Sequence, residues 1–76
     1  MKYIIKITDN TKYTTYAGEG TYTFQGEKYL VLVEHKQEAK LYSSKSRAIK
    51  AANSYQRTCC NTSGNVEIIP ILDKEN

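Results

Sequence analysis

Tyrosines are the residues best equipped for recognition chemistry in this chain, which holds seven of them among 76 residues. Four, Tyr13, Tyr16, Tyr22 and Tyr29, fall in the first half, where the sequence reads as β-structure. A tyrosine offers a large contact area with a hydroxyl at its rim, which suits protein interfaces, and its ring stacks on the bases of single-stranded nucleic acid. Ordinary β-propensity on a wet sheet face gives the same composition, so all three interpretations stay open.

Cations are the second candidate group, because they are concentrated in one region. Residues 36–60 hold six cations against Glu38, a net charge of +5, whereas the whole chain carries +3. Lys45 and Arg47 lie among serines at the expected start of a helix, where a cation is unfavourable against the helix dipole. Free amides, hydroxyls and two cations together would suit a phosphate or carboxylate. A solvated helix end explains the same residues.

Two further cations extend this basic region along the expected helix. Lys50 and Arg57 lie seven residues apart, which is two helical turns, so both fall on one face. They predict a thin basic stripe opposite an alanine-rich face. An amphipathic helix exposes charged residues in any case, so a plain solvated face is the alternative.

Catalysis and metal binding have little support. His35 is the only histidine, so no Ser-His-acid set can be argued. The two cysteines, Cys59 and Cys60, with His35 give three ligands where a structural zinc site wants four, and neighbours in a helix pair poorly as a disulfide. There is no glycine-rich phosphate loop. We therefore expect no catalytic residue, no metal and no cofactor, and we expect Cys59 to fill the core.

Strands are predicted in the first half by alternation. In the segment 2–8, Tyr3, Ile5 and Ile7 share one face, which leaves Ile4 on the wet side. The later segments are a weak strand over 11–17, a break at 18–20, a short strand over 21–24, a hairpin turn over 25–28 with Gly26 left-handed, and a strand over 29–34. That last strand is apolar on both faces, so a central position in the sheet is expected.

One helix and one more strand are predicted in the second half. Ser43 or Ser44 is the natural N-cap of a helix that runs to about Cys60. Its apolar face is formed by Ala48, Ala51, Ala52, Tyr55 and Cys59. The helix is expected to stop at a left-handed Gly64. The segment 66–72 then predicts a strand. Because Pro70 cannot donate a ladder hydrogen bond, this strand is expected either to lie at an edge of the sheet or to pair only along its early half.

The predicted fold class is α+β: a small antiparallel sheet of four to five strands with a single helix on one face, the helix lying between the last two strands. A chain of this length predicts a single domain over 1–76, with a β-hairpin half (1–35), a strand–helix–strand half (40–72) and a tail (73–76). No apolar run is long enough to cross a membrane, and the N-terminus lacks a signal-peptide cleavage site. A cytoplasmic protein is expected.

The second half carries a pattern in three parts: the segment 38–44 (Glu-Ala-Lys-Leu-Tyr-Ser-Ser), Ala48 with Ala51-Ala52, and the segment 66–69 (Val-Glu-Ile-Ile). This pattern resembles that of a group of small accessory proteins from phages and mobile elements of Gram-positive bacteria. It covers a little under half of the chain and is a packing pattern. It implies a strand–helix–strand unit on a sheet and an accessory role. Several such proteins antagonise host defences, anti-CRISPR proteins among them. The family pattern has acids in the first helical turn, where this chain has Lys45, Ser46 and Arg47.

Two functional hypotheses follow. The first is a non-enzymatic protein-binding module, an anti-CRISPR-like inhibitor that occludes a bacterial defence complex, which is a protein or nucleoprotein partner in the host cytoplasm. The alternative is a nucleic-acid-binding accessory protein that uses a basic helix and stacking tyrosines. A homodimer through the open sheet face or an edge strand is compatible with both. The expected binding residues are Tyr13, Tyr16, Tyr22, Tyr29, Lys45, Arg47, Lys50 and Arg57.

Overall fold

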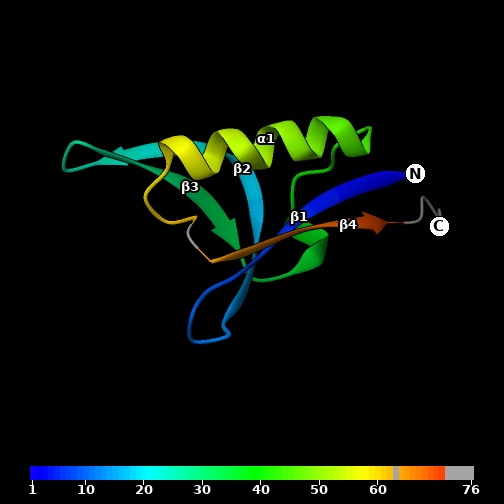
Figure 1. Cartoon of the computed structure of the whole chain (residues 1–76), viewed down its shortest axis with the longest axis horizontal. Coiled ribbons are helices and arrows are strands. Elements are labelled where there is room, and N and C mark those ends of the chain that lie inside the picture. The colour runs from blue at the N-terminus through cyan, green and yellow to red at the C-terminus, as the bar shows by residue number, and fades with distance from the viewer. Residues whose placement is uncertain (63, 72–76) are drawn as a thin grey trace.

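The computed structural model describes residues 1–62 and 64–71 of the chain. Its elements are, in order, β1 (Lys2–Thr8), β2 (Thr14–Phe24), β3 (Glu27–Val33), the short 3-10 helix η1 (Lys36–Glu38), α1 (Lys45–Thr58) and β4 (Asn65–Ile71). The four strands form one antiparallel sheet in the order β3-β2-β1-β4. The helix lies between β3 and β4 in sequence (Figure 1). The predicted α+β fold class is thereby confirmed, with four strands.

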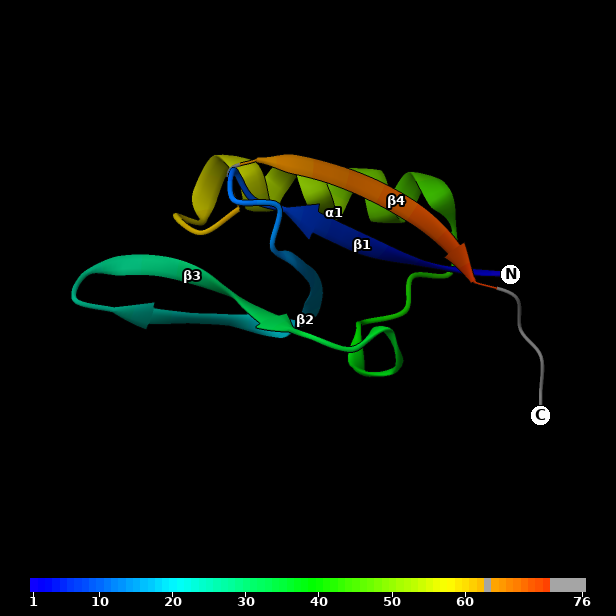
Figure 2. The ribbon, with the colours of Figure 1, turned by 90° about the horizontal axis from the view of Figure 1, so that it is seen from below.

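The helix covers one face of β1 and β4. Figure 2 shows α1 crossing behind β1 and β4, while the β2–β3 hairpin extends away from them and its tip reaches beyond the end of the helix. The core under the helix includes Ile5, Ile7, Leu30, Ala48 and Ala52. The two alanines are buried with very little side-chain volume, so they allow the helix to lie close to the sheet.

β1 and β2 are paired over only part of their length, and a connecting segment of the chain lies between them where they separate. β1 pairs with β2 only from Lys6 to Thr8, and the two strands separate beyond that point. The segment 39–42 enters this gap: Tyr3 and Tyr42 exchange N–H···O bonds of 2.9 and 2.8 Å, and the Lys40 N–H donates to Ala17 O at 2.9 Å. The extended stretch before the helix is therefore a sheet component.

This closure corrects the expectation for Ile4. The alternation placed its side chain on the wet side, yet it is 0% exposed. At this point β1 lies between two neighbours, with Ile69 of β4 opposite Ile4 and the segment 39–42 beside Tyr3. The face away from the helix is thus partly apolar, and its centre is dry.

The second and third predicted strands are one strand. β2 runs from Thr14 to Phe24, and Gly18 to Gly20 form an irregularity in its pairing with β3 where a break was expected. The positive φ of Gly20, 85°, accommodates the extra length of a bulge. The turn that follows is the expected hairpin, with Gln25 at φ 52° and Gly26 at φ 81°, both left-handed as a two-residue turn requires.

The prediction of a central position for β3 was wrong, because β3 is an edge strand. The end of the helix protects part of this edge. The Leu30 N–H donates to Asn61 Oδ1, the Asn61 amide nitrogen donates to Leu30 O, both at 2.9 Å, and the Cys60 N–H donates to Lys28 O. The Asn61 side chain thus bonds like a neighbouring strand. The apolar run is explained by burial of Leu30 under the helix and by a half-buried opposite face.

The helix begins at one of the two predicted N-cap serines. At its C-terminal end the hydrogen bonds come from the Thr62 side chain, and the predicted stop at Gly64 lies farther along the chain. The Ser44 hydroxyl accepts from the Arg47 N–H, which makes Ser44 the N-cap. At the other end, the buried Thr62 hydroxyl donates to Tyr55 O and lies within bonding distance of Cys59 O. Gly64 is left-handed, as expected, but it stands beyond the helix end and closely approaches Thr8.

β4 is an edge strand, which is one of the two arrangements expected from Pro70. The expected final residue of this strand, Leu72, and the expected tail over 73–76 lie outside the described residues.

Candidate binding surfaces

An aromatic surface lies on the face of the hairpin that points away from the helix. The pairings of Tyr16 with Val33 and of Tyr22 with Tyr29 place these side chains on one face, since side chains two residues apart on a strand share a face. We call the aromatic face the set formed by Tyr16, Tyr22, Phe24, Tyr29, Val31 and Val33. Leu30, on the opposite side of β3, belongs to the core under the helix.

The outer half of the aromatic face is accessible. The rings of Tyr22 and Tyr29 are stacked, with centroids 5.5 Å apart and planes 15° from parallel. Tyr22 is 50% exposed and Phe24 is 58% exposed, while Tyr29 is half-buried between them and the body of the sheet. Burial of the ring raises the pKa of Tyr29, and the charge of Glu27 adds to this effect. The Tyr29 hydroxyl therefore stays neutral to a higher pH than that of an ordinary tyrosine.

The glycine at the inner end of this face has a packing role. A Cβ added at Gly18 would lie 3.1 Å from Val31 Cγ1 and 3.2 Å from Val33 Cγ1. The two valines therefore pack directly over the backbone of β2. The aromatic face is continuous from the valines to the hairpin tip because no side chain intervenes at Gly18.

Tyr13 does not belong to the aromatic face. It precedes β2 at the end of the strand opposite to the hairpin tip, and its hydroxyl donates to the Glu34 carboxylate. That hydrogen bond raises the pKa of Tyr13. Tyr13 is 52% exposed, but it ties the start of β2 to the residue that follows β3. Of the four tyrosines predicted to bind, the structure gathers Tyr16, Tyr22 and Tyr29.

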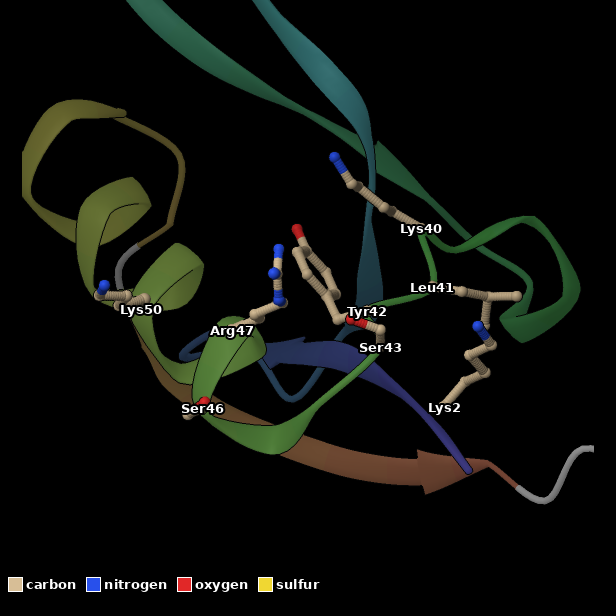
Figure 3. A pocket seen from close by; sticks show the side chains of 8 residues that line it. All are labelled: Lys2, Lys40, Leu41, Tyr42, Ser43, Ser46, Arg47 and Lys50. Carbon is tan, nitrogen blue, oxygen red and sulfur yellow. The ribbon is translucent and has the colours of Figure 1, made fainter.

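A basic hollow lies at the other end of the molecule. It has a volume of about 830 Å³, and we define it by its lining residues, Lys2, Lys40, Leu41, Tyr42, Ser43, Ser46, Arg47 and Lys50. Three parts of the chain contribute: the first residue of β1, the segment before the helix, and the first turns of α1. Figure 3 shows Arg47 beside Tyr42 near the middle of this group, with Lys2 and Lys50 on opposite flanks.

Among the described residues, most charges of the basic hollow have no acidic partner. Lys40 Nζ lies 3.9 Å from Glu19 Oε1 and 5.5 Å from the centre of the Tyr42 ring. Within residues 1–62 and 64–71, no acid lies within ion-pair distance of Lys2, Arg47 or Lys50, and none lines the hollow. Tyr42 forms a buried floor, and its hydroxyl meets that of Tyr55 at 3.2 Å. Burial is the main reason why the pKa of Tyr42 is raised.

The predicted cations therefore separate into two pairs. Arg47 and Lys50 line the hollow, whereas Lys45 and Arg57 are exposed on the same helix outside it. Lys2 and Lys40 were missed because the sequence does not show that β1 and the segment 39–42 meet beside the helix start. Phe24 was missed as well, although its alternation with Tyr22 was a usable signal.

The side chains that could ligate a metal are dispersed in the described part of the chain. His35 is exposed ahead of η1, and among the described residues no three His, Cys, Asp or Glu side chains cluster as metal ligands. Cys59 is buried in the core, as predicted. Within the part of the chain that the structure describes, no helix is long and apolar enough to cross a membrane.

Comparison with protein-family models, with curated proteins and with solved structures found no match.

Proposed function

We propose that this chain is a non-enzymatic binding module that docks onto a partner protein through the aromatic face. The observation that carries the proposal is the exposed ring of Tyr22, stacked on the half-buried Tyr29, with the exposed Phe24 beside them near the tip of a hairpin that projects beyond the helix. A folded chain gains little by leaving the rings of Tyr22 and Phe24 in water, whereas a partner that buries them gains contact area with few rotors to freeze.

The composition of this face favours protein over nucleic acid. The side chains of β2 and β3 on the aromatic face include Glu27 and no cation, since Lys28 lies on the opposite face. Single-stranded nucleic acid needs cations along its backbone beside the stacking rings. The basic hollow lies toward the other end of a molecule 41 Å long, so one strand would have to span most of that length to contact both surfaces.

The resemblance to phage accessory proteins suggests a more specific form of the proposal. The partner would be a bacterial defence complex, and the module would inhibit it by occluding a surface that the complex needs. Anti-CRISPR proteins are one such class. This form predicts that the purified chain inhibits target cleavage by a reconstituted defence nuclease and that the inhibition requires the aromatic face.

The test compares two matched variants in affinity capture from bacterial lysate, with and without nuclease. Tyr22→Ala with Phe24→Ala removes the two most exposed rings of the face, and Tyr13→Ala removes an equally exposed ring outside it. We expect one stoichiometric, nuclease-resistant partner that Tyr13→Ala retains. We expect the double variant to bind it at least about ten-fold more weakly, as the loss of a hot-spot residue would cause.

Three results would overturn the proposal. The double variant could bind as tightly as the parent chain while remaining folded by thermal unfolding. The captured material could disappear after nuclease treatment, which would favour the nucleic-acid alternative. Sedimentation could show that the aromatic face is already buried in a homodimer, in which case Tyr22→Ala with Phe24→Ala would yield a monomer.

A further inference from the structure

We infer that the basic hollow is a binding site for a ligand with two or three adjacent phosphate groups. This site is separate from the aromatic face and does not depend on the function proposed above. The ligand chemistry follows from three features: the positive charge that no acid among residues 1–62 and 64–71 compensates, the donors around the hollow, and its size.

The charge of the hollow sets the charge of its ligand. Lys2, Lys40, Arg47 and Lys50 all line it, and only Lys40 has an acidic neighbour among the described residues, the exposed Glu19. About three positive charges therefore share one concave surface and repel one another. A single carboxylate would neutralise one of them. A diphosphate or triphosphate, or a short run of a nucleic-acid backbone, would neutralise all three.

The donors suit phosphate oxygens. Arg47 carries a planar guanidinium whose N–H groups match a phosphate in a bidentate fashion, and lysine ammonium groups bind phosphate as point charges. Ser43 and Ser46 also line the hollow and add two hydroxyl groups. The Ser44 hydroxyl already accepts from the Arg47 backbone N–H, so the side chains, rather than this amide, supply the contacts.

The size of the hollow agrees with this assignment. Its volume of 830 Å³ falls within the range of about 300–1,000 Å³ typical of small-molecule sites. Its floor is held in place by the structure around Tyr42. This residue is buried, its hydroxyl is hydrogen-bonded to that of Tyr55, and its backbone exchanges two hydrogen bonds with Tyr3. Lys2 projects from β1, Arg47 and Lys50 project from α1, and Lys40 projects from the segment 39–42, which is hydrogen-bonded to β1 and β2.

The experiment uses isothermal titration and amide NMR shifts with three probes: inorganic triphosphate, ADP and an oligo-dT strand. We expect saturable one-to-one binding of triphosphate, with shifts at Lys2, Ser43, Ser46 and Arg47. Binding of triphosphate and ADP without the strand would assign a free nucleotide-type ligand. Binding of the strand as well, with log K falling against log salt by about 0.7 per neutralised phosphate, would assign a nucleic-acid backbone.

Two double variants on the same helix provide the matched comparison. Arg47→Gln with Lys50→Gln removes two charges from the hollow, and Lys45→Gln with Arg57→Gln removes two charges outside it. All four positions are exposed, and glutamine is a good helix former, so both variants should fold. We expect the first to weaken triphosphate binding by at least about ten-fold, because two charge-assisted contacts are lost, and the second by no more than about two-fold.

Equal weakening by both variants would overturn the inference, because it would show diffuse attraction to a basic helix. So would the absence of saturable binding by all three probes at low salt, or tighter binding of an acidic peptide than of triphosphate. Tyr22→Ala with Phe24→Ala should leave triphosphate binding unchanged. A failure of the aromatic-face proposal is thereby distinguishable from a failure of this one.

Discussion

At the scale of single residues, Cys60 combines an exposed thiol with a carboxylate partner. Its Sγ donates to Glu27 Oε1 at 2.9 Å, and this bond is the main reason why the pKa of the thiol is raised. Since the thiolate is the reactive form, Cys60 should alkylate slowly for an exposed cysteine. We expect Glu27→Gln to accelerate iodoacetamide labelling of Cys60 at about pH 8. Site-resolved mass spectrometry would follow the rate.

The control for this prediction is Glu67→Gln. Glu67 is an exposed acid on β4 that pairs with Lys6 at 3.7 Å. This variant removes the same charge without touching the thiol. If both variants label Cys60 at the parent rate, the Glu27 bond does not govern its reactivity.

Asp9 organises the turn between β1 and β2 and should make it sensitive to acid. Its Oδ1 accepts from the Thr11 hydroxyl at 2.7 Å and from the N–H groups of Thr11 and Tyr13. These bonds lower the pKa of the Asp9 carboxyl, and the bond from the Thr11 hydroxyl has the largest effect. Two backbone bonds also close this turn, because the Lys12 N–H donates to Asp9 O at 3.0 Å and the Asp9 N–H donates to Tyr13 O at 3.1 Å.

A lowered pKa means that the ionised carboxylate stabilises the native state. This contribution is present above the unfolded pKa of about 4 and is lost as pH falls through the lower native value. We expect Asp9→Asn to flatten the decline of unfolding free energy between about pH 4 and pH 2, measured by urea denaturation. Glu38→Gln removes an exposed acid from η1 and should keep the parent pH profile. Identical profiles for all three proteins would contradict the assignment.

At the scale of elements, Asn61 is the contact that joins the helix end to the edge of β3. Its amide exchanges two hydrogen bonds with the backbone of Leu30, a fully buried residue. Asn61→Ala should cost about 1–3 kcal/mol in unfolding free energy, because the Leu30 N–H and C=O lose their partners. Asn61→Asp can still accept from the Leu30 N–H, so its effect on exchange of that amide should be smaller.

Denaturant unfolding and hydrogen exchange at the Leu30 amide would measure these effects. Asn53→Ala on the exposed side of the helix is the control and should change little. A loss of protection at Leu30 as large in Asn53→Ala as in Asn61→Ala would refute the role given to Asn61.

Gly64 lies very close to the backbone of β1, and a comparison with Gly26 can test how much this contact matters, because both glycines are left-handed. Gly26 and Gly64 have φ of 81° and 108°, so an added side chain strains both. A Cβ at Gly26 would meet nothing within 4 Å, whereas one at Gly64 would lie 2.5 Å from Thr8 O. We expect Gly26→Ala to cost about 1–2 kcal/mol. Gly64→Ala should cost about 1–3 kcal/mol more, in urea unfolding, because the backbone of β1 must move.

The elements defined by local patterns could be predicted from the sequence. β1 was predicted with its bounds, the N-cap of the helix was predicted to be one of two serines, and the apolar face of the helix was predicted as well. Each of these features depends on residues only a few positions apart in the sequence. The edge position of β3 could not be, since strand order is decided by long-range pairing. The burial of Ile4 has the same cause, because its cover comes from distant segments of the chain.

The same limit applies to the candidate surfaces: single residues could be predicted, but their grouping could not. Tyr22 and Tyr29 were identified from composition, Arg47 from its place at the expected start of the helix, and Lys50 from helical spacing. Their grouping with Phe24 or with Lys2 and Lys40 depends on tertiary placement, which no spacing encodes.

At the scale of the whole molecule, stability should be distributed unevenly. β1 is central in the sheet, and Ile5 and Ile7 lie in the core beneath the helix. Residues 21–28 of the hairpin are all exposed. We expect native-state hydrogen exchange to be slowest at the β1 amides and to occur by local opening at the hairpin tip, independent of low denaturant concentrations. Equal, globally limited exchange in both regions would contradict this gradient.

The pairing of β1 with β4 has a consequence for the kinetics of folding. Lys2 lies opposite Ile71 and Thr8 opposite Asn65, so the central strand depends on partners from the far end of the described chain. The β2–β3 hairpin closes a two-residue turn, whereas this pairing must close a loop that contains almost every other element. Folding should therefore begin at the hairpin and the helix. The rate-limiting step should be the arrival of β4, and until then an apolar strand edge on β1 stays open to other chains.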